Sequence, residues 1–253
     1  MKLWTRFNRR KFILKIDVLG VGFNNLTLEE AVQAGAGLVE AEGFHYTVTP
    51  NPEFLLTARK NDAFKQALLG ADLVLPDGVG VLYSAKILGR PLKSRVPGIE
   101  FAQGLLAWMA GHGKRLFLLG AKPGVAELAA ANLKSTYPGL IICGTHDGYF
   151  QEDGPVVEEI RASAADVVFV CLGAPKQELW MVHNGPATGA HLMIGLGGSL
   201  DVFAGVVERA PKTFQKLGLE WLHRLIKEPK RFGRMAKLPL VLWYALGARI
   251  RRR

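Results

Sequence analysis

The chain has 253 residues, of which 49% are hydrophobic and 21% charged, a composition typical of one large globular domain or a domain with an appendage. Its net charge of +10 is uneven, because residues 1–15 carry +6 and residues 222–253 carry +9, which leaves −5 for the middle. This distribution argues against a nucleic-acid-binding protein and predicts that an anionic partner docks at the ends. No apolar stretch reaches the roughly 18–20 residues that span a bilayer, and no signal peptide is indicated.

Strand and helix signals alternate along residues 1–211. In chain order, strands are expected over residues 13–20, 44–49, 72–75, 115–119, 140–144, 166–172 and 191–196. Helices are expected from a capping box at 27–30 to about 42, and over 52–69, 79–88, 98–110, 125–137 and 155–164. Repeated βα units with strands that are apolar on both sides predict an α/β fold, with a mostly parallel Rossmann-like sheet covered by helices on both faces.

From about residue 212 the character of the chain changes. Residues 213–228 predict an amphipathic helix, Pro229 breaks or restarts it, and a second helical piece ends in the apolar run 238–246. We therefore expect a catalytic body over 1–211 and a basic, helical appendage over 212–253. The two cysteines, Cys143 and Cys171, lie in apolar runs and predict buried thiols of a reducing compartment.

Four loops carry the polar residues most suggestive of chemistry, because ligands of open parallel sheets bind at the carboxyl ends of the strands. These loops are residues 49–53, 76–80, 172–178 and 195–201. Asp77 ends an apolar strand and precedes Gly78, so its carboxylate is placed as a general base would be. From spacing alone, an Asx turn or a helix N-cap is the more common explanation of such an aspartate.

The other polar residues of these loops have two interpretations each. Thr49 and Asn51 can hydrogen-bond sugar hydroxyls, or can serve as turn residues ahead of a helix. Lys176 and Gln177 stand at a predicted helix start, where backbone N–H groups suit a phosphate or a uracil carbonyl, whereas Glu178 also fits a first-turn partner of the helix dipole. The loop before Asp201 reads Gly-Leu-Gly-Gly-Ser, which suits a nucleotide without specifically indicating NAD.

No Asp-x-Asp pair, with which many nucleotide-sugar enzymes hold a divalent ion, occurs in the chain. No metal site and no cofactor are therefore expected, and the cations for a diphosphate leaving group must come from the protein. Arg95 is one candidate in the body, and the appendage offers Arg224, Lys227, Arg231 and Arg234 on one narrow face of a continuous helix. A solvated basic stripe is the alternative.

The apolar run 238–246 includes Trp243 and Tyr244 and is flanked by Lys237 and the terminal arginines. It suits a helix lying in the headgroup layer of a membrane, where each basic residue near an anionic leaflet contributes ~1 kcal/mol. The alternatives are a helix packed on the body and a contact between copies in a homo-oligomer.

Taken together, the loops resemble the WecG/TagA/CpsF group, glycosyltransferase family 26, over roughly residues 18–234. The matching motifs are Thr49-Pro-Asn-Pro-Glu53, Pro76-Asp-Gly78, Arg95-Val-Pro-Gly98, Leu172-Gly-Ala-Pro-Lys-Gln-Glu178 with Trp180, residues 195–201 with Arg209-Ala-Pro211, and Glu220-Trp-Leu-His-Arg224 followed by Glu228-Pro, Arg231 and Arg234. One such loop is a weak signal, but all of them in this order are highly specific and outweigh the alternative interpretations.

The resemblance implies an inverting, metal-independent transferase of bacterial surface-polysaccharide synthesis, peripheral on the cytoplasmic face of the membrane. Such enzymes move N-acetylmannosamine or its uronic acid from a UDP-sugar to N-acetylglucosaminyl-diphospho-undecaprenol, and some use other donors such as UDP-glucose. By resemblance, Asp77 is the base, the sugar pocket is lined by Thr49, Asn51, Arg95 and Gln177, and Asp201 lies on the nucleotide side, with Arg224, Arg231 and Arg234 closing over the diphosphates. Lys176 and Glu178, at the same predicted helix start as Gln177, are also expected to bind the substrate. The competing hypotheses are a nucleotide-dependent dehydrogenase and a non-catalytic lipid-binding protein.

Overall fold

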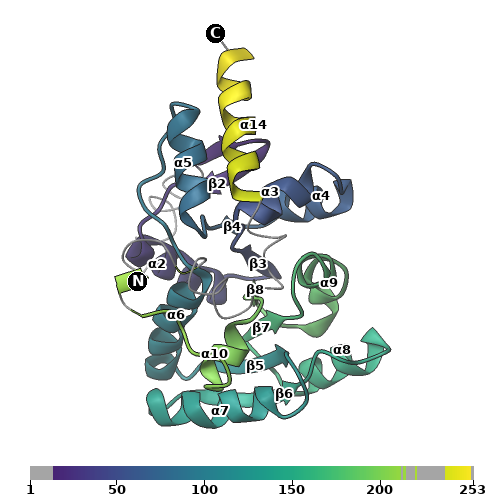
Figure 1. Ribbon diagram of the computed structural model, residues 1–253. Coiled ribbons are helices and arrows are strands. Elements are labelled where there is room, and N and C mark those ends of the chain that lie inside the picture. Colours follow the sequence, from purple (N-terminus) through teal and green to yellow (C-terminus); the bar gives the residue numbers. More distant parts are fainter. Residues whose placement is uncertain (1–13, 212, 215–219, 221–236, 252–253) are drawn as a thin grey trace.

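The computed structural model describes residues 14–211, 213–214, 220 and 237–251. At its centre is a six-stranded parallel sheet with the order β4-β3-β8-β7-β5-β6 (Figure 1). In chain order its strands are β3 (His45–Val48), β4 (Leu73–Val74), β5 (Arg115–Gly120), β6 (Ile141–His146), β7 (Val167–Cys171) and β8 (Leu192–Gly195). The predicted α/β fold with a parallel sheet is therefore confirmed.

Helices pack on both faces of this sheet and form two apolar clusters. One cluster receives side chains from α3 (Pro52–Ala58), α4 (Asp62–Leu69), α5 (Val79–Ile87), α8 (Asp153–Ala162), α9 (Lys176–Asn184) and α14 (Lys237–Arg251). The other receives them from α2 (Leu28–Val39), α6 (Gly98–His112), α7 (Val125–Thr136) and α10 (Ser199–Phe203). A short 3₁₀ helix, η1 (Gly185–Thr188), follows α9. Every residue of β7 is buried, as expected of a parallel strand covered on both faces.

A small antiparallel pair, β1 (Lys15–Val18) and β2 (Val21–Asn24), lies outside the main sheet. The prediction of one strand over residues 13–20 was wrong in missing this reversal. The chain turns at Leu19 and Gly20, whose φ angles are +56° and +89°, as in the two-residue turns that favour right-twisted hairpins. Leucine rarely adopts positive φ, so Leu19 gave no turn signal.

The helix predicted over residues 52–69 is interrupted in the structure. α3 ends at Ala58, and Asn61 begins α4 as its N-cap, with Oδ1 accepting from the N–H of Phe64 at 2.9 Å. An N-cap residue has non-helical backbone, so this asparagine separates two helices that apolar periodicity alone would join. The capping box predicted at Thr27 and Glu30 is confirmed at the start of α2.

The C-terminal helix α14 lies against α5 and α3 (Figure 1). Val241 and Ala245 are fully buried there, and the guanidinium of Arg249 donates to the carbonyl oxygen of Leu88 at 2.9 Å. One face of this helix therefore packs on the body, as one of the alternatives predicted, while its other face is exposed. Across the part of the chain that the structure describes, no helix combines the length and the apolar character needed to cross a membrane.

Candidate active site

The carboxyl edge of the sheet, where the parallel strands end, brings the four predicted loops together. The strands β4, β3, β8 and β7 are neighbours in the sheet, so the loops that follow them also lie next to one another. Three hydrogen bonds join these loops in turn: Asp77 N–H to Pro50 O at 3.1 Å, Thr49 Oγ1 to Gly195 O at 3.2 Å, and Gly197 N–H to Gln177 Oε1 at 3.0 Å. The loops therefore form one connected surface.

Asp77 lies at this edge, just beyond β4, and is partly exposed. Gly78, and not Asp77, is the N-cap of α5, with a φ of +96° that suits glycine, so the N-cap interpretation of Asp77 is wrong. The N–H of Gly98, the first residue of α6, donates to Asp77 Oδ2 at 3.4 Å. The carboxylate thus lies beside the start of α6, and the partial exposure of Asp77 shows that this residue is not in the packed interior.

Thr49 and Asn51 lie on the loop after β3, and both make internal hydrogen bonds. Thr49 is 8% exposed and packs so close to Gly98 that a Cβ there would lie 2.9 Å from Thr49 Oγ1. Asn51 caps α3, because its Oδ1 accepts from the N–H groups of Glu53 at 2.8 Å and Phe54 at 3.3 Å. The structure thus shows Asn51 in the turn role that the sequence left open, beside the Asp77 loop.

Gln177 and Glu178 are buried at the start of α9, with 2% and 0% of their surfaces exposed. Gln177 Nε2 donates to Glu178 Oε1 at 2.6 Å, while Gln177 Oε1 accepts from Gly197. Both side chains occupy space left by Gly195, since a Cβ there would lie 2.8 Å from Gln177 Nε2. The pair therefore braces the loop after β8 from within the protein.

Glu178 has an unusual electrostatic environment for a carboxyl group. Burial raises the pKa of Glu178 from its ordinary 4.5 to about 7, although the hydrogen bond from Gln177 acts in the opposite direction. Its Oε2 atom is buried without a hydrogen-bond partner among the residues that the structure describes. A folded-state pKa above the unfolded value means that the group stabilises the fold below about pH 4.5 and loses this contribution as the pH rises through about 7.

The variant E178Q should remove this pH dependence while keeping the hydrogen bond from Gln177. We expect the free energy of unfolding of E178Q, relative to the parent protein, to rise between pH 5 and pH 8 by on the order of 2–3 kcal/mol. Urea unfolding at the two pH values measures the difference, and E158Q, at an exposed position of α8, is the matched control. Equal pH slopes in E178Q and the parent would show that Glu178 does not titrate in this range.

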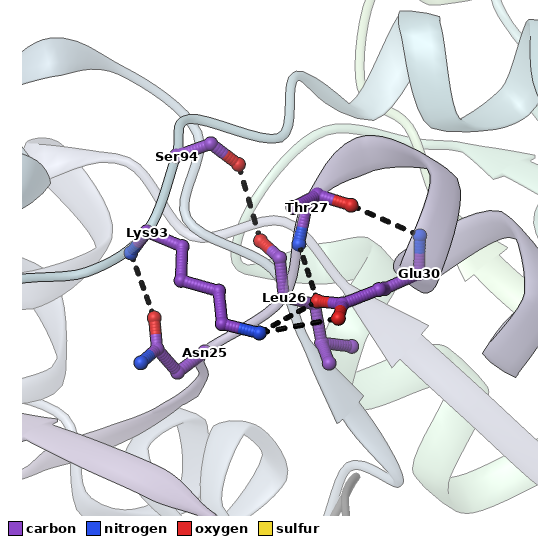
Figure 2. A network of polar contacts seen from close by, with 6 residues as sticks. All are labelled: Asn25, Leu26, Thr27, Glu30, Lys93 and Ser94. Atoms are coloured by element: carbon purple, nitrogen blue, oxygen red, sulfur yellow. Dashed lines mark hydrogen bonds and ion pairs between the residues drawn. The ribbon is translucent and has the colours of Figure 1, made fainter.

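Figure 2 shows how the segment that leads to Arg95 is tied to the start of α2. The bonds from this segment are Lys93 N–H to Asn25 Oδ1 at 2.7 Å, Lys93 Nζ to Glu30 Oε2 at 2.9 Å, and Ser94 Oγ to Leu26 O at 3.1 Å. On the other side of Arg95, the N–H of Val96 donates to Pro76 O at 2.9 Å. The backbone of Arg95 is therefore held on both sides, next to the loop that carries Asp77.

The side chain of Arg95 joins a cluster of four alternating charges. Its NH1 atom donates to Glu220 Oε2 at 2.8 Å, and Arg209 Nε donates to Glu220 Oε1 at 3.0 Å. Arg209 also pairs with Glu100, in the first turn of α6. The sequence analysis named Arg209 and Glu220 only within motifs and missed Glu100. The pair Arg209 and Glu100 is separated by 109 positions in the sequence, and the pair Arg95 and Glu220 by 125, so no local pattern indicates these contacts.

The remaining predicted site residues differ in how the structure places them. Asp201 lies in the first turn of α10 and is partly exposed. Lys176 is exposed, with Nζ 4.7 Å from the centre of the Phe150 ring and 3.3 Å from Gly148 O. Arg224, Arg231 and Arg234 lie outside the described residues.

Asp77 and the segment that carries Arg95 thus lie together at the carboxyl edge of a parallel sheet, where ligands of such sheets commonly bind. Residues 16–253 match the glycosyl transferase WecG/TagA/CpsF family, and the chain belongs to this family. The family that the sequence motifs suggested is thus confirmed, and the chain is a glycosyltransferase.

Curated relatives cover most of the chain. An N-acetylglucosaminyldiphosphoundecaprenol N-acetyl-beta-D-mannosaminyltransferase of Bacillus spizizenii strain W23 is 39% identical over 194 residues, which is 77% of this chain and 76% of the relative. A protein of the same description from Staphylococcus aureus strain MW2 is 35% identical over 232 residues, covering 90% of this chain and 91% of the relative.

Proposed function

We propose that this chain transfers N-acetylmannosamine from a UDP-sugar to N-acetylglucosaminyldiphosphoundecaprenol in bacterial surface-polymer synthesis. The observation that carries the proposal is the 35–39% identity, over most of the chain, to enzymes described by that acceptor and that sugar. Asp77 also supports a sugar transfer, because it is partly exposed at the carboxyl edge, between the loop that follows β3 and the first residue of α6.

The proposed reaction is a single in-line displacement. Asp77 takes the proton of the acceptor sugar hydroxyl as its oxygen attacks the anomeric carbon of the donor. The bond from that carbon to the diphosphate oxygen breaks, UDP leaves with the bonding electron pair, and the configuration at the carbon inverts. Arg95 and the arginines at 224, 231 and 234 stabilise the negative charge on the departing diphosphate, as fixed cations do in preorganised sites.

A donor panel tests the proposal. The purified protein is mixed with the lipid-linked N-acetylglucosamine acceptor and with UDP-N-acetylmannosamine, UDP-N-acetylmannosaminuronic acid, UDP-N-acetylglucosamine or UDP-glucose, and acceptor-dependent UDP release is measured. The proposal requires the highest kcat/KM with UDP-N-acetylmannosamine. A preference for UDP-glucose would overturn the sugar assignment while keeping the reaction class, and release without acceptor would argue against transfer.

We further propose that residues 212–253 act as a unit that contacts the anionic membrane surface and closes the active site. The support lies on α14, where Trp243 and Ile250 are 68% and 65% exposed while Val241 and Ala245 are buried against the body. Leu240 and Leu246 are also exposed, and the spacing of three to four residues places all four apolar side chains on the outer face of the helix. An outward apolar face with Arg251 beside it suits the headgroup layer.

The double variant W243S/I250S tests this contact. If each side chain is only half buried in the membrane, it contributes about 1 kcal/mol to binding. Loss of both should therefore weaken binding to vesicles that contain anionic phospholipid by at least about 10-fold. Co-sedimentation measures the binding. The control is L128S, which removes an exposed leucine from α7, at the opposite end of the molecule in Figure 1. Equal binding by W243S/I250S and the parent protein would place the membrane contact elsewhere.

A further inference from the structure

Glu178 is buried at the start of α9 in a way that a role as partner of the helix dipole does not explain. None of its surface is exposed, Oε1 accepts from Gln177 Nε2 at 2.6 Å, and Oε2 has no hydrogen-bond partner among the described residues. Burial of a carboxyl group with an unsatisfied oxygen costs free energy, whereas a first-turn carboxylate also interacts with the helix dipole from a solvent-exposed position. The buried position therefore indicates a different role, which involves its partner Gln177.

Glu178 determines which end of the Gln177 amide faces which neighbour. An amide has a donor end and an acceptor end of nearly the same shape, so hydrogen bonding sets its orientation. Here Nε2 donates to Glu178 Oε1, and Oε1 of Gln177 accepts from the N–H of Gly197 at 3.0 Å. Burial raises the pKa of Glu178 to about 7, but its Oε1 can accept this bond in both protonation states. The orientation therefore depends on the acceptor oxygen of Glu178 and not on its charge.

The loop after β8 depends on this amide at Gly197. The N–H groups on either side of it in the loop donate to backbone carbonyl oxygens, that of Leu196 to Val170 at 2.9 Å and that of Ser199 to Leu196 at 3.2 Å. The N–H of Gly197 instead donates to the side chain of Gln177. Loss of the oriented amide would therefore release the loop at Gly197 while leaving these two backbone hydrogen bonds in place.

The same loop lies beside residues of the candidate active site. The carbonyl oxygen of Gly195 accepts from Thr49 Oγ1 at 3.2 Å, and Asp201 lies partly exposed in the first turn of α10. A Cβ at Gly195 would lie 2.8 Å from Gln177 Nε2 and 3.2 Å from Glu178 Oε1, so the pair packs directly against the loop. A shift of the pair thus moves backbone atoms at the edge where ligands of parallel sheets bind.

We propose that Glu178 is a positioning residue, which orients the Gln177 amide and thereby fixes the loop after β8, residues 195–201, in the conformation that receives the nucleotide-linked donor. Glu178 acts from within the protein and does not touch the substrate. The role in donor binding rests on the proposed function, whereas the fixing of the loop does not. Because a fixed loop contributes to binding both before and during the reaction, loss of Glu178 should raise the KM for the donor more than it lowers kcat.

The variants E178M and E178Q separate the acceptor oxygen of residue 178 from the shape of its side chain. Methionine has a similar length and only a weakly accepting sulfur, whereas glutamine retains an oxygen that can accept from Gln177. Hydrogen exchange of the Gly197 amide reports the state of the loop without any need for activity. We expect this amide to exchange at least about 10-fold faster in E178M than in the parent protein.

Binding and turnover give the second set of measurements. In E178M, the affinity for UDP, measured by calorimetric titration, should fall about 10-fold, and the donor KM should rise by a similar factor with a smaller change in kcat. E178Q should restore the exchange rate and the UDP affinity to within about 2-fold of the parent, because its oxygen can replace Oε1 of the glutamate.

M109A is the control for a general loss of stability. Met109 is buried near the opposite end of α6 from Gly98, and its truncation leaves a cavity that destabilises the fold. We expect M109A to lower the free energy of unfolding without changing the exchange of the Gly197 amide or the affinity for UDP. If E178M does not fold, the same readouts on G195A decide, because its added Cβ would displace the flexible end of Gln177 from the other side.

Unchanged exchange of the Gly197 amide in E178M would overturn the positioning role. Equal acceleration in M109A would also overturn it, since exchange would then follow global unfolding. Faster exchange with unchanged UDP affinity and donor KM would overturn the role in donor binding and leave the fixing of the loop in place. If E178Q behaved as E178M does, orientation through the acceptor oxygen would be wrong. If the parent protein transfers no sugar to the lipid-linked acceptor, the proposed function fails, and the exchange rates still decide whether Glu178 fixes the loop.

Discussion

The variant D77N should bind UDP with the affinity of the parent protein and transfer sugar about 10²–10⁴-fold more slowly. An asparagine keeps the shape of the side chain and can still accept the hydrogen bond from Gly98 through its oxygen. It has no basic carboxylate, so the acceptor hydroxyl must attack without transferring its proton to the enzyme. The effect therefore belongs in kcat, which acceptor-dependent UDP release measures, while calorimetric titration with UDP measures binding.

The control for D77N is D62N, which removes an exposed carboxylate from the first turn of α4 and should leave kcat unchanged. The pH profile adds an independent reading, because the acidic limb of kcat/KM should disappear in D77N if Asp77 must be ionised. Turnover in D77N close to that of the parent would remove Asp77 as the base.

The triple variant R224A/R231A/R234A should lose at least about 10³-fold in kcat, since removal of a single preorganised donor at a developing charge commonly costs 10²–10³-fold. The physical reason is that the diphosphate leaves with a negative charge, which we propose that these guanidinium groups stabilise. Donors with a better leaving group than UDP should be less affected by the variant, which separates charge stabilisation from binding. The measurement is acceptor-dependent release of the leaving group with detergent-solubilised acceptor.

Two comparison proteins sharpen that experiment. R161A removes an exposed arginine on α8 and should behave as the parent does. R231K keeps a positive charge without the bidentate fork, so it should fall between the parent and the triple variant. Activity of the triple variant equal to that of the parent would show that the leaving group is stabilised by other groups.

Deletion of all residues after Pro211 is a less specific test than the arginine variants. It removes α14, whose Val241 and Ala245 complete an apolar cluster with α3 and α5. The deletion would expose apolar side chains of these two helices as well as remove the arginines. An inactive fragment would therefore not distinguish a loss of folding stability from the loss of the arginines.

The parallel sheet could be predicted because its signal is local. Runs such as residues 166–172 and 191–196 are apolar after their first residue and end in glycine-containing loops, so they match strands buried on both faces. The hairpin at Leu19 could not be predicted, since leucine seldom adopts the positive φ observed there. The break at Asn61 was readable as an N-cap, but the apolar periodicity on either side suggested one continuous helix.

The active-site prediction was limited by contacts that only the folded chain reveals. The strand-end positions of Thr49 and Asp77 follow from topology, and the structure joins their loops by hydrogen bonds. Gln177 and Glu178 stand at a helix start, as expected, but the absence of a side chain at Gly195 lets both turn inward. No sequence pattern indicates which side chains in the first turn of a helix will pack against a glycine of another loop.

The docking of α14 has a consequence for how this side of the molecule folds. The hydrogen bond from Arg249 to Leu88 joins residues 161 positions apart, and Val241 and Ala245 are buried where α14 contacts α5 and α3. Contacts this far apart in the sequence cost loop-closure entropy before they contribute stability. The apolar cluster of α3 and α5 is therefore completed only when the last helix of the chain returns to it.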